Sequence, residues 1–138
     1  MINQEEAHRL AHAFIDAVRA GHLPDELLTE DMTGWITTGG TIPRETYRAM
    51  VASLQAMLDG PIEMTVDAVT AEAGRVVIEA HSSARLVNGE DYANTYVYVL
   101  RLSEDGRIAS VAEHYNALTA QEKLLPLMKQ LRAEGTLP

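Results

Sequence analysis

The sequence has no cysteine among its 138 residues. This absence excludes disulfides, thiolate metal sites and cysteine nucleophiles. No run approaches the roughly 18 consecutive apolar residues that a membrane-spanning helix requires. The segment Met1–Glu6 is polar and acidic, whereas a secretory signal is basic and then apolar. We therefore expect a cytoplasmic protein that does not associate with membranes.

Positive charge is also scarce. Eleven Lys and Arg residues stand against twenty Asp and Glu residues, giving a net charge of −9, and the basic residues are scattered. This pattern excludes the basic surface that binds a phosphate backbone, so we expect no nucleic-acid partner. The length fits one domain covering residues 1–138, with no linker, repeat or low-complexity tract.

Helical patterns occupy much of the first half of the chain. Asn3 and Glu6 resemble a capping box before apolar residues at helical spacing, which end at Gly21. Pro43 suits the first turn of a second helix, which ends near residue 58. Residues 32–37 and 62–68 have the patterns of two short strands.

Three strand patterns joined by two glycine turns follow and predict an antiparallel meander. The strands are Arg75–Val87, Tyr92–Leu102 and Ile108–Ala117, and the turns are Asn88-Gly89 and Asp105-Gly106. Thr119 and Glu122 then indicate the start of a terminal helix. Pro126 either kinks this helix or lies in the first turn of a new one. The order of elements indicates an α+β fold with helices packed on one face of a sheet.

Three segments carry a resemblance to a known family: Asn88–Tyr96, Asp105–Ile108 and Glu113–Asn116. With the length and the element order, they make the chain similar to the nuclear transport factor two-like superfamily, especially its SnoaL-like and ketosteroid-isomerase-like members. The resemblance implies a cone-shaped, curved, antiparallel-rich mixed sheet around N-terminal helices, with a C-terminal helix (a cystatin-like α+β barrel). It also implies a hydrophobic pocket, a small hydrophobic ligand and a homodimer.

The resemblance and the two turns together predict which side chains face the pocket. Counting back from the turns places Asn94, Tyr96, Tyr98 and Leu100 inward on the middle strand, Val111, Glu113 and Tyr115 on the last strand, and Glu79, His81, Ser83 and Arg85 on the first strand. The apolar residues of the first strand, Val76, Ile78, Ala80, Ala84 and Leu86, then face outward. Two interpretations remain open. Either the register is slipped and these apolar residues fill the cone, or they are buried against a second subunit and the cavity is polar.

Under the second interpretation, Glu113 and His81 are the candidate catalytic residues. A carboxylate in an enclosed site has a raised pKa that suits proton transfer, and an imidazole titrates near neutral pH. The alternative for Glu113 is a structural carboxylate, paired with Arg85 or capped by a tyrosine hydroxyl. The candidate substrate-binding residues are Trp35, Asn94, Tyr96, Tyr98, Tyr115, Val111 and Phe14. Several of these aromatic residues also suit ordinary packing.

The sequence departs from the ketosteroid isomerases at their catalytic positions. The positions of their base aspartate, helix tyrosine and second acid hold Gly34 or Trp35, Phe14 and Tyr98. We therefore do not expect that mechanism, nor do we find the aspartate–arginine–aspartate set of related epoxide hydrolases. His8 and His12 lack a third metal ligand, so no metal site or cofactor is predicted.

These patterns leave three hypotheses for the function. The first is an isomerase, cyclase or dehydratase that acts on a hydrophobic carbonyl compound without a cofactor. The second is a noncatalytic carrier of a lipid-like metabolite. The third is a dimerisation or docking module whose cavity is filled with side chains.

Overall fold

The computed structural model describes residues 2–138, which form one curved sheet and the helices that cover it. The elements are α1 (Gln4–Ala20), η1 (Asp25–Leu27), β1 (Leu28–Ile36), β2 (Gly40–Pro43), α2 (Arg44–Ala56), β3 (Glu63–Glu72), β4 (Arg75–Arg85), β5 (Asp91–Leu102), β6 (Ile108–Tyr115), α3 (Ala117–Lys123) and α4 (Leu125–Ala133). None of the helices within residues 2–138 is long and apolar enough to cross a membrane.

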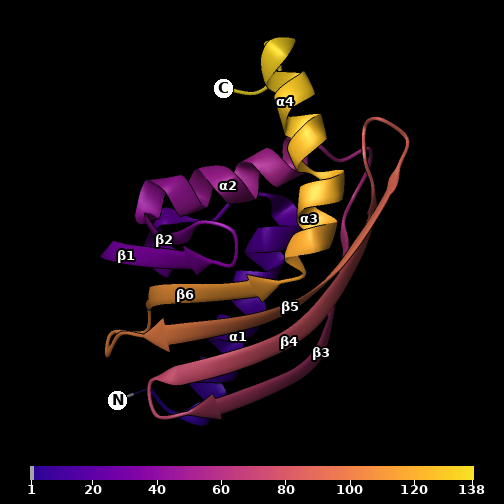
Figure 1. The fold of residues 1–138 in the computed structure, drawn as a ribbon. Coiled ribbons are helices and arrows are strands. Elements are labelled where there is room, and N and C mark those ends of the chain that lie inside the picture. The colour runs from indigo at the N-terminus through magenta and orange to yellow at the C-terminus, as the bar shows by residue number, and fades with distance from the viewer. Residues whose placement is uncertain (1) are drawn as a thin grey trace.

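The sheet is mixed and has six strands in the order β2-β1-β6-β5-β4-β3. The pairing of β1 with β6 is parallel, and every other pairing is antiparallel. Figure 1 shows the long strands β3, β4 and β5 bending around α1, with α2 and α3 over the other end of the sheet. The predicted α+β fold, a cone-like sheet wrapped around helices, is confirmed.

The ends of α1 follow from the residues that cap it. The Asn3 side chain accepts a hydrogen bond from the Glu6 N–H (2.8 Å), and Gly21 ends the helix with a φ of 72°. Between these caps, the apolar face is buried against β3 and β4. Both helix boundaries read from the sequence are confirmed.

The β4–β5 hairpin differs from the prediction by one residue. A two-residue Asn88-Gly89 turn would place Val87 opposite Glu90. Instead, the Leu86 N–H donates to the Glu90 carbonyl (2.8 Å), and the loop holds three residues, with Gly89 at a φ of 87°. Since side chains alternate between faces, this single extra residue exchanges the two faces of β4 relative to β5.

The predicted inward face of β4 is therefore wrong. Tyr96 lies opposite Ala80, and directly opposed residues share a face of a sheet. The residues buried on the concave side of β4 are Val76, Ile78, Ala80 and Ser82, whereas Glu79, His81, Ser83 and Arg85 are exposed. The first interpretation of this strand is correct: its apolar residues belong to the core of the monomer and are not available to a second subunit.

The C-terminal region contains two helices, and the first does not begin at the capping box predicted for Thr119 and Glu122. Asn116 caps α3 by accepting hydrogen bonds from the N–H groups of Leu118 (3.1 Å) and Thr119 (3.3 Å), so the helix begins before Thr119. Leu124 ends α3 and precedes α4, and Pro126 lies in the first turn of α4. Of the two alternatives for Pro126, the new helix is correct.

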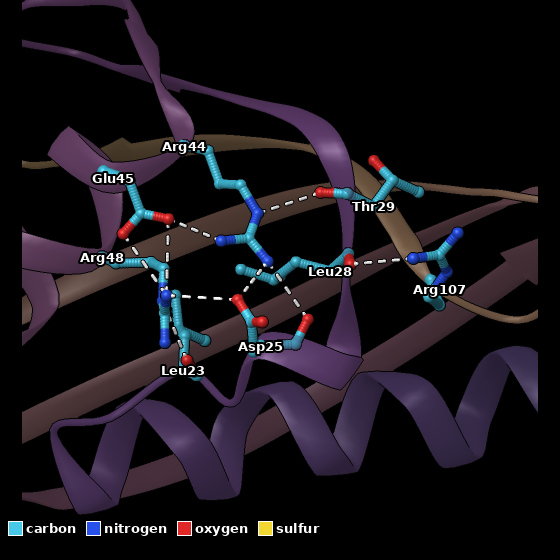
Figure 2. A network of polar contacts seen from close by, with 8 residues as sticks. All are labelled: Leu23, Asp25, Leu28, Thr29, Arg44, Glu45, Arg48 and Arg107. Carbon is cyan, nitrogen blue, oxygen red and sulfur yellow. Dashed lines mark hydrogen bonds and ion pairs between the residues drawn. The ribbon is translucent and has the colours of Figure 1, made fainter.

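Three arginines fix the loop after α1 and the start of β1 by donating hydrogen bonds to main-chain carbonyls there (Figure 2). Arg44 Nε donates to Thr29 (3.0 Å), Arg48 Nε to Leu23 (3.0 Å) and Arg107 Nη1 to Leu28 (3.4 Å). The carboxylates of Asp25 and Glu45 hold the first two guanidinium groups in place. This network sets the position of α2, which carries one wall of the candidate site.

Candidate functional site

A pocket of about 360 Å³ lies between α2, the α3–α4 pair and the concave face of the sheet. Its size is within the range of small-molecule sites. Methionine and aliphatic side chains form much of its wall, including Met50 and Leu54 from α2, Met57 at its C-terminal cap, and Leu124 and Met128 beyond α3. The sheet contributes an acid and four tyrosines to it from β5 and β6.

Glu113 is the acidic side chain of the pocket among residues 2–138. It lies on β6 with only 8% of its surface exposed, and its Oε1 accepts a hydrogen bond from the Tyr47 hydroxyl (2.7 Å). Oε2 has no protein partner within residues 2–138, yet no buried side-chain oxygen there is unsatisfied, so Oε2 is accessible from the pocket. Burial raises the pKa of Glu113 to about 7, against the smaller opposing effect of the Tyr47 bond.

Tyr47 reaches Glu113 because β1 carries a glycine beneath it. A Cβ added at Gly34 would lie 2.6 Å from Cδ1 of the Tyr47 ring, closer than any side chain tolerates. The absence of a side chain at this position lets the fully buried Tyr47 side chain pack directly against β1. Gly34 is also one of two candidates for the position of the isomerase base aspartate, so Tyr47 occupies the space that a side chain there would need.

Four tyrosines of β5 and β6 line the pocket: Tyr92, Tyr96, Tyr98 and Tyr115. Tyr98 lies opposite Glu113 in the sheet and stacks on Tyr96, with ring centroids 5.5 Å apart. Burial raises the pKa of both Tyr96 and Tyr98 above the ordinary value, and the negative charge of Glu113 adds to this. Both hydroxyls therefore remain protonated and can act as hydrogen-bond donors.

The hydroxyl groups of Tyr96 and Tyr115 already have one partner each. Tyr96 shares a hydrogen bond with Ser82 Oγ (2.9 Å), and Tyr115 shares one with Thr38 Oγ1 (2.5 Å). A hydroxyl group both donates and accepts, so each tyrosine retains capacity for a ligand. No partner of the Tyr98 hydroxyl is present within residues 2–138, and this group is accessible from the pocket.

Three of the predicted substrate-binding residues face the inside of the fold but do not reach the pocket. Asn94 donates to the Tyr92 hydroxyl (2.8 Å) and to the Asn116 carbonyl (3.2 Å), and its oxygen accepts two main-chain N–H bonds. Phe14 contacts the Tyr98 ring edge to face, with centroids 5.2 Å apart, and Val111 is buried in the core. None of the three lines the pocket.

The structure places two predicted site residues on the outer face of the sheet. His81 is exposed and its Nδ1 bonds Asp67 (2.8 Å), the extra residue of a bulge in β3. Trp35 is 36% exposed and packs on His114, with centroids 4.7 Å apart. The pairing of His81 with Glu113 and the role of Trp35 as a pocket wall are therefore wrong, for His81 because of the β4 register and for Trp35 because its strand position points outward.

Sequence reasoning did not identify Tyr47 as a partner of Glu113. The available signal was a tyrosine on the apolar face of the second helix, since a buried phenol needs a hydrogen-bond partner. It also omitted Arg132 and Tyr92 from the pocket. The structure contains no group of three His, Asp or Glu side chains within residues 2–138 that is arranged to hold a metal ion.

Comparisons with known proteins agree with this architecture. The sequence profile of the SnoaL-like domain matches residues 11–111, and no curated protein matches the sequence. PrhC from Penicillium brasilianum NBRC 6234 is a similar solved structure (TM-score 0.74, 19% identity, 96% of this chain and 92% of that one). An LEH-like epoxide hydrolase from M. tuberculosis is also similar (TM-score 0.68, 16% identity, 94% of this chain and 97% of that one). A third similar structure is a proposed SnoaL-like polyketide cyclase from Jannaschia sp. CCS1 (TM-score 0.72, 15% identity, 88% of this chain and 94% of that one).

Proposed function

The chain belongs to the SnoaL-like domain family, and we propose that it is an enzyme that transfers a proton on an apolar carbonyl compound, as an isomerase, cyclase or dehydratase does. Glu113 is the acid–base residue. The observation that carries the proposal is a carboxyl group with a pKa of about 7, buried in a largely apolar pocket and flanked by tyrosine hydroxyls. A group that titrates near the working pH is available in both protonation states, as proton transfer requires.

We propose that the reaction uses two pocket groups that have no partner within residues 2–138, Glu113 Oε2 and the Tyr98 hydroxyl. The accessible Oε2 of Glu113 removes a proton from the carbon next to the substrate carbonyl. The negative charge that develops on the carbonyl oxygen is stabilised by a donated hydrogen bond, and we assign this role to the Tyr98 hydroxyl because it lines the pocket opposite Glu113. Glu113 then returns the proton to another atom of the substrate, so the step needs no other reactant.

Tyr47 orients the carboxyl group in this scheme. Its bond to Oε1 fixes the rotamer of Glu113 and leaves Oε2 toward the pocket. The same bond favours the charged form, so Tyr47 keeps the pKa of Glu113 from rising further. We propose that Tyr47 is a positioning residue and that Phe14, through its contact with the Tyr98 ring, has the same role for the donor.

The names of the similar structures support a carbonyl or ether substrate without identifying it. One is a proposed polyketide cyclase and another is an epoxide hydrolase. Cyclisation of a polyketide begins with removal of a proton next to a carbonyl, which is the chemistry that Glu113 suits. The pocket volume of about 360 Å³ favours a compound of two or three fused rings or an equivalent chain.

A second candidate function is ligand binding without turnover. One specific observation favours it: Glu113 is the acidic side chain of the pocket within residues 2–138, and His81 lies on the other face. Under this alternative, Glu113 and Tyr98 form hydrogen bonds to the ligand, and no proton of the ligand is transferred.

Solvent deuterium exchange separates the two functions. Flat apolar ketones such as 2-tetralone are incubated in D₂O with the protein, and loss of the α-proton signal is followed by NMR. We expect exchange with the unmodified protein and loss of at least about 100-fold with Glu113→Gln. His81→Ala is the matched control and retains full activity, because His81 lies outside the pocket. Binding of ketones with no exchange by the unmodified protein supports the carrier and contradicts the enzyme.

We also propose a homodimer formed through the outer face of the sheet. Trp35, Ala112, Val99 and Val77 lie opposite one another on four adjacent strands, giving an apolar row across this face. Val97 next to the row is 38% exposed. Such a row on the solvent side of a sheet suits contact with the same row of a second copy.

A further inference from the structure

Arg132 is the basic side chain of the pocket among residues 2–138. It lies on the last turn of α4 and is exposed, whereas Glu113 is buried on the sheet. Met128, one turn earlier on α4, places an apolar surface beside it. The pocket therefore has a carboxyl group at its inner wall and a guanidinium group at its mouth.

Two nitrogen atoms of the Arg132 guanidinium group are available to a ligand. Its Nε donates a hydrogen bond to the main-chain oxygen of Pro138 (3.1 Å), whereas Nη1 and Nη2 have no partner within residues 2–138, and no Asp or Glu side chain there forms an ion pair with Arg132. Most other arginines are neutralised by carboxylates, as Arg44 and Arg48 are in Figure 2. The Nη groups of Arg132 are thus available at a pocket in a chain with a net charge of −9.

We propose that the ligand of this pocket is an amphipathic acid, with an apolar carbonyl-bearing body inside and a carboxylate bound by the Nη atoms of Arg132 at the mouth. This inference rests on the proposed function and assigns the class of its substrate. The guanidinium fork matches the two oxygens of a carboxylate, and at the mouth that carboxylate remains partly hydrated. The overall negative charge repels anions, so any preference for an acid must come from this local cation.

Calorimetric binding of a matched pair of probes tests the inference. The acid is 2-naphthylacetic acid and the neutral probe is 2-naphthylacetamide, at about pH 6 and roughly 20 mM salt, where exposed charges are weakly screened. We expect the unmodified protein to bind the acid about fivefold more tightly than the amide. Arg132→Gln should abolish this preference, so that the acid and the amide bind with similar affinity.

Lys129→Gln is the matched control. Lys129 is exposed on the same helix, forms no ion pair within residues 2–138 and does not line the pocket, so its loss changes the net charge equally without touching the site. The preference for the acid should be retained in Lys129→Gln. In about 0.5 M salt, this preference should become weaker in both the unmodified protein and Lys129→Gln.

Equal binding of acid and amide to the unmodified protein overturns the inference, as does a preference that persists in Arg132→Gln. Tighter binding of 2-naphthyl phosphate than of the acid overturns the assignment to a carboxylate. Binding of the amide without a preference for the acid leaves the proposed function standing. If neither probe binds, this inference is overturned, whereas the proposed function is decided separately by the deuterium exchange assay.

Discussion

Burial of Glu113 should make the stability of this protein depend on pH in a defined direction. Its pKa is about 7 in the folded state and 4.5 in an exposed chain, so the folded state holds the proton more strongly. This contribution to stability is fully present below about pH 4.5 and is lost as the pH rises through 7. The whole difference corresponds to roughly 3 kcal/mol, of which about 2–3 kcal/mol falls between pH 5 and pH 8.

Glu113→Gln isolates this contribution. Glutamine has the same shape, and its amide oxygen can still accept the Tyr47 hydrogen bond, but it does not titrate. The exposed carboxylates whose pKa values are lowered by ion pairs, such as Asp25 and Glu90, behave alike in both proteins and cancel. The variant should therefore lose less stability than the unmodified protein on going from pH 5 to pH 8.

Urea unfolding followed by circular dichroism at the two pH values gives the four free energies needed. The predicted result is a double difference of about 2–3 kcal/mol, with Glu113→Gln the more stable protein at pH 8. A double difference below about 0.5 kcal/mol would refute the reasoning, because it would mean that Glu113 titrates alike in the folded and unfolded chains.

Three further predictions concern the supports of the site and the outer face. Tyr47→Phe removes the bond that favours ionised Glu113, so the midpoint of the pH–rate profile for deuterium exchange should move to higher pH. Gly34→Ala places a Cβ against the Tyr47 ring and should lower the free energy of unfolding by about 1–3 kcal/mol, measured in urea. Val97→Asp should convert a dimer into a monomer in analytical ultracentrifugation, while Thr65→Asp at the edge of the same face should not; a dimer that persists in Val97→Asp contradicts the proposed interface.

The general fold was predictable because each element carried its own local signal. Asn3 and Gly21 mark both ends of the first helix, and glycines at the two turns define the strands of the meander. The inward faces of β5 and β6 were also predicted, since Tyr98 and Glu113 do lie opposite each other and inward. The SnoaL-like resemblance that these segments carried is confirmed by the family match.

The strand register was not predictable to one residue. Asn88-Gly89 suits a two-residue and a three-residue hairpin loop alike, and the choice between them decides whether Ala80 or His81 lies beside Tyr96. The apolar pattern of β4 was the better guide, because burying Val76 and Ile78 in the core outweighs a turn preference. Tyr47 could not be paired with Glu113 from sequence because 66 residues separate them and only the packing of α2 on β1 joins them.

The central claim is that Glu113 titrates near neutral pH in a pocket where it can exchange a proton with a ligand. Carbon-13 NMR of protein labelled at the glutamate side-chain carboxyl carbons tests it directly, with Glu113→Gln identifying the resonance. The account predicts one resonance with a midpoint near pH 7, absent from the variant. A midpoint for Glu113 at or below about pH 5, close to that of an exposed glutamate, would contradict it.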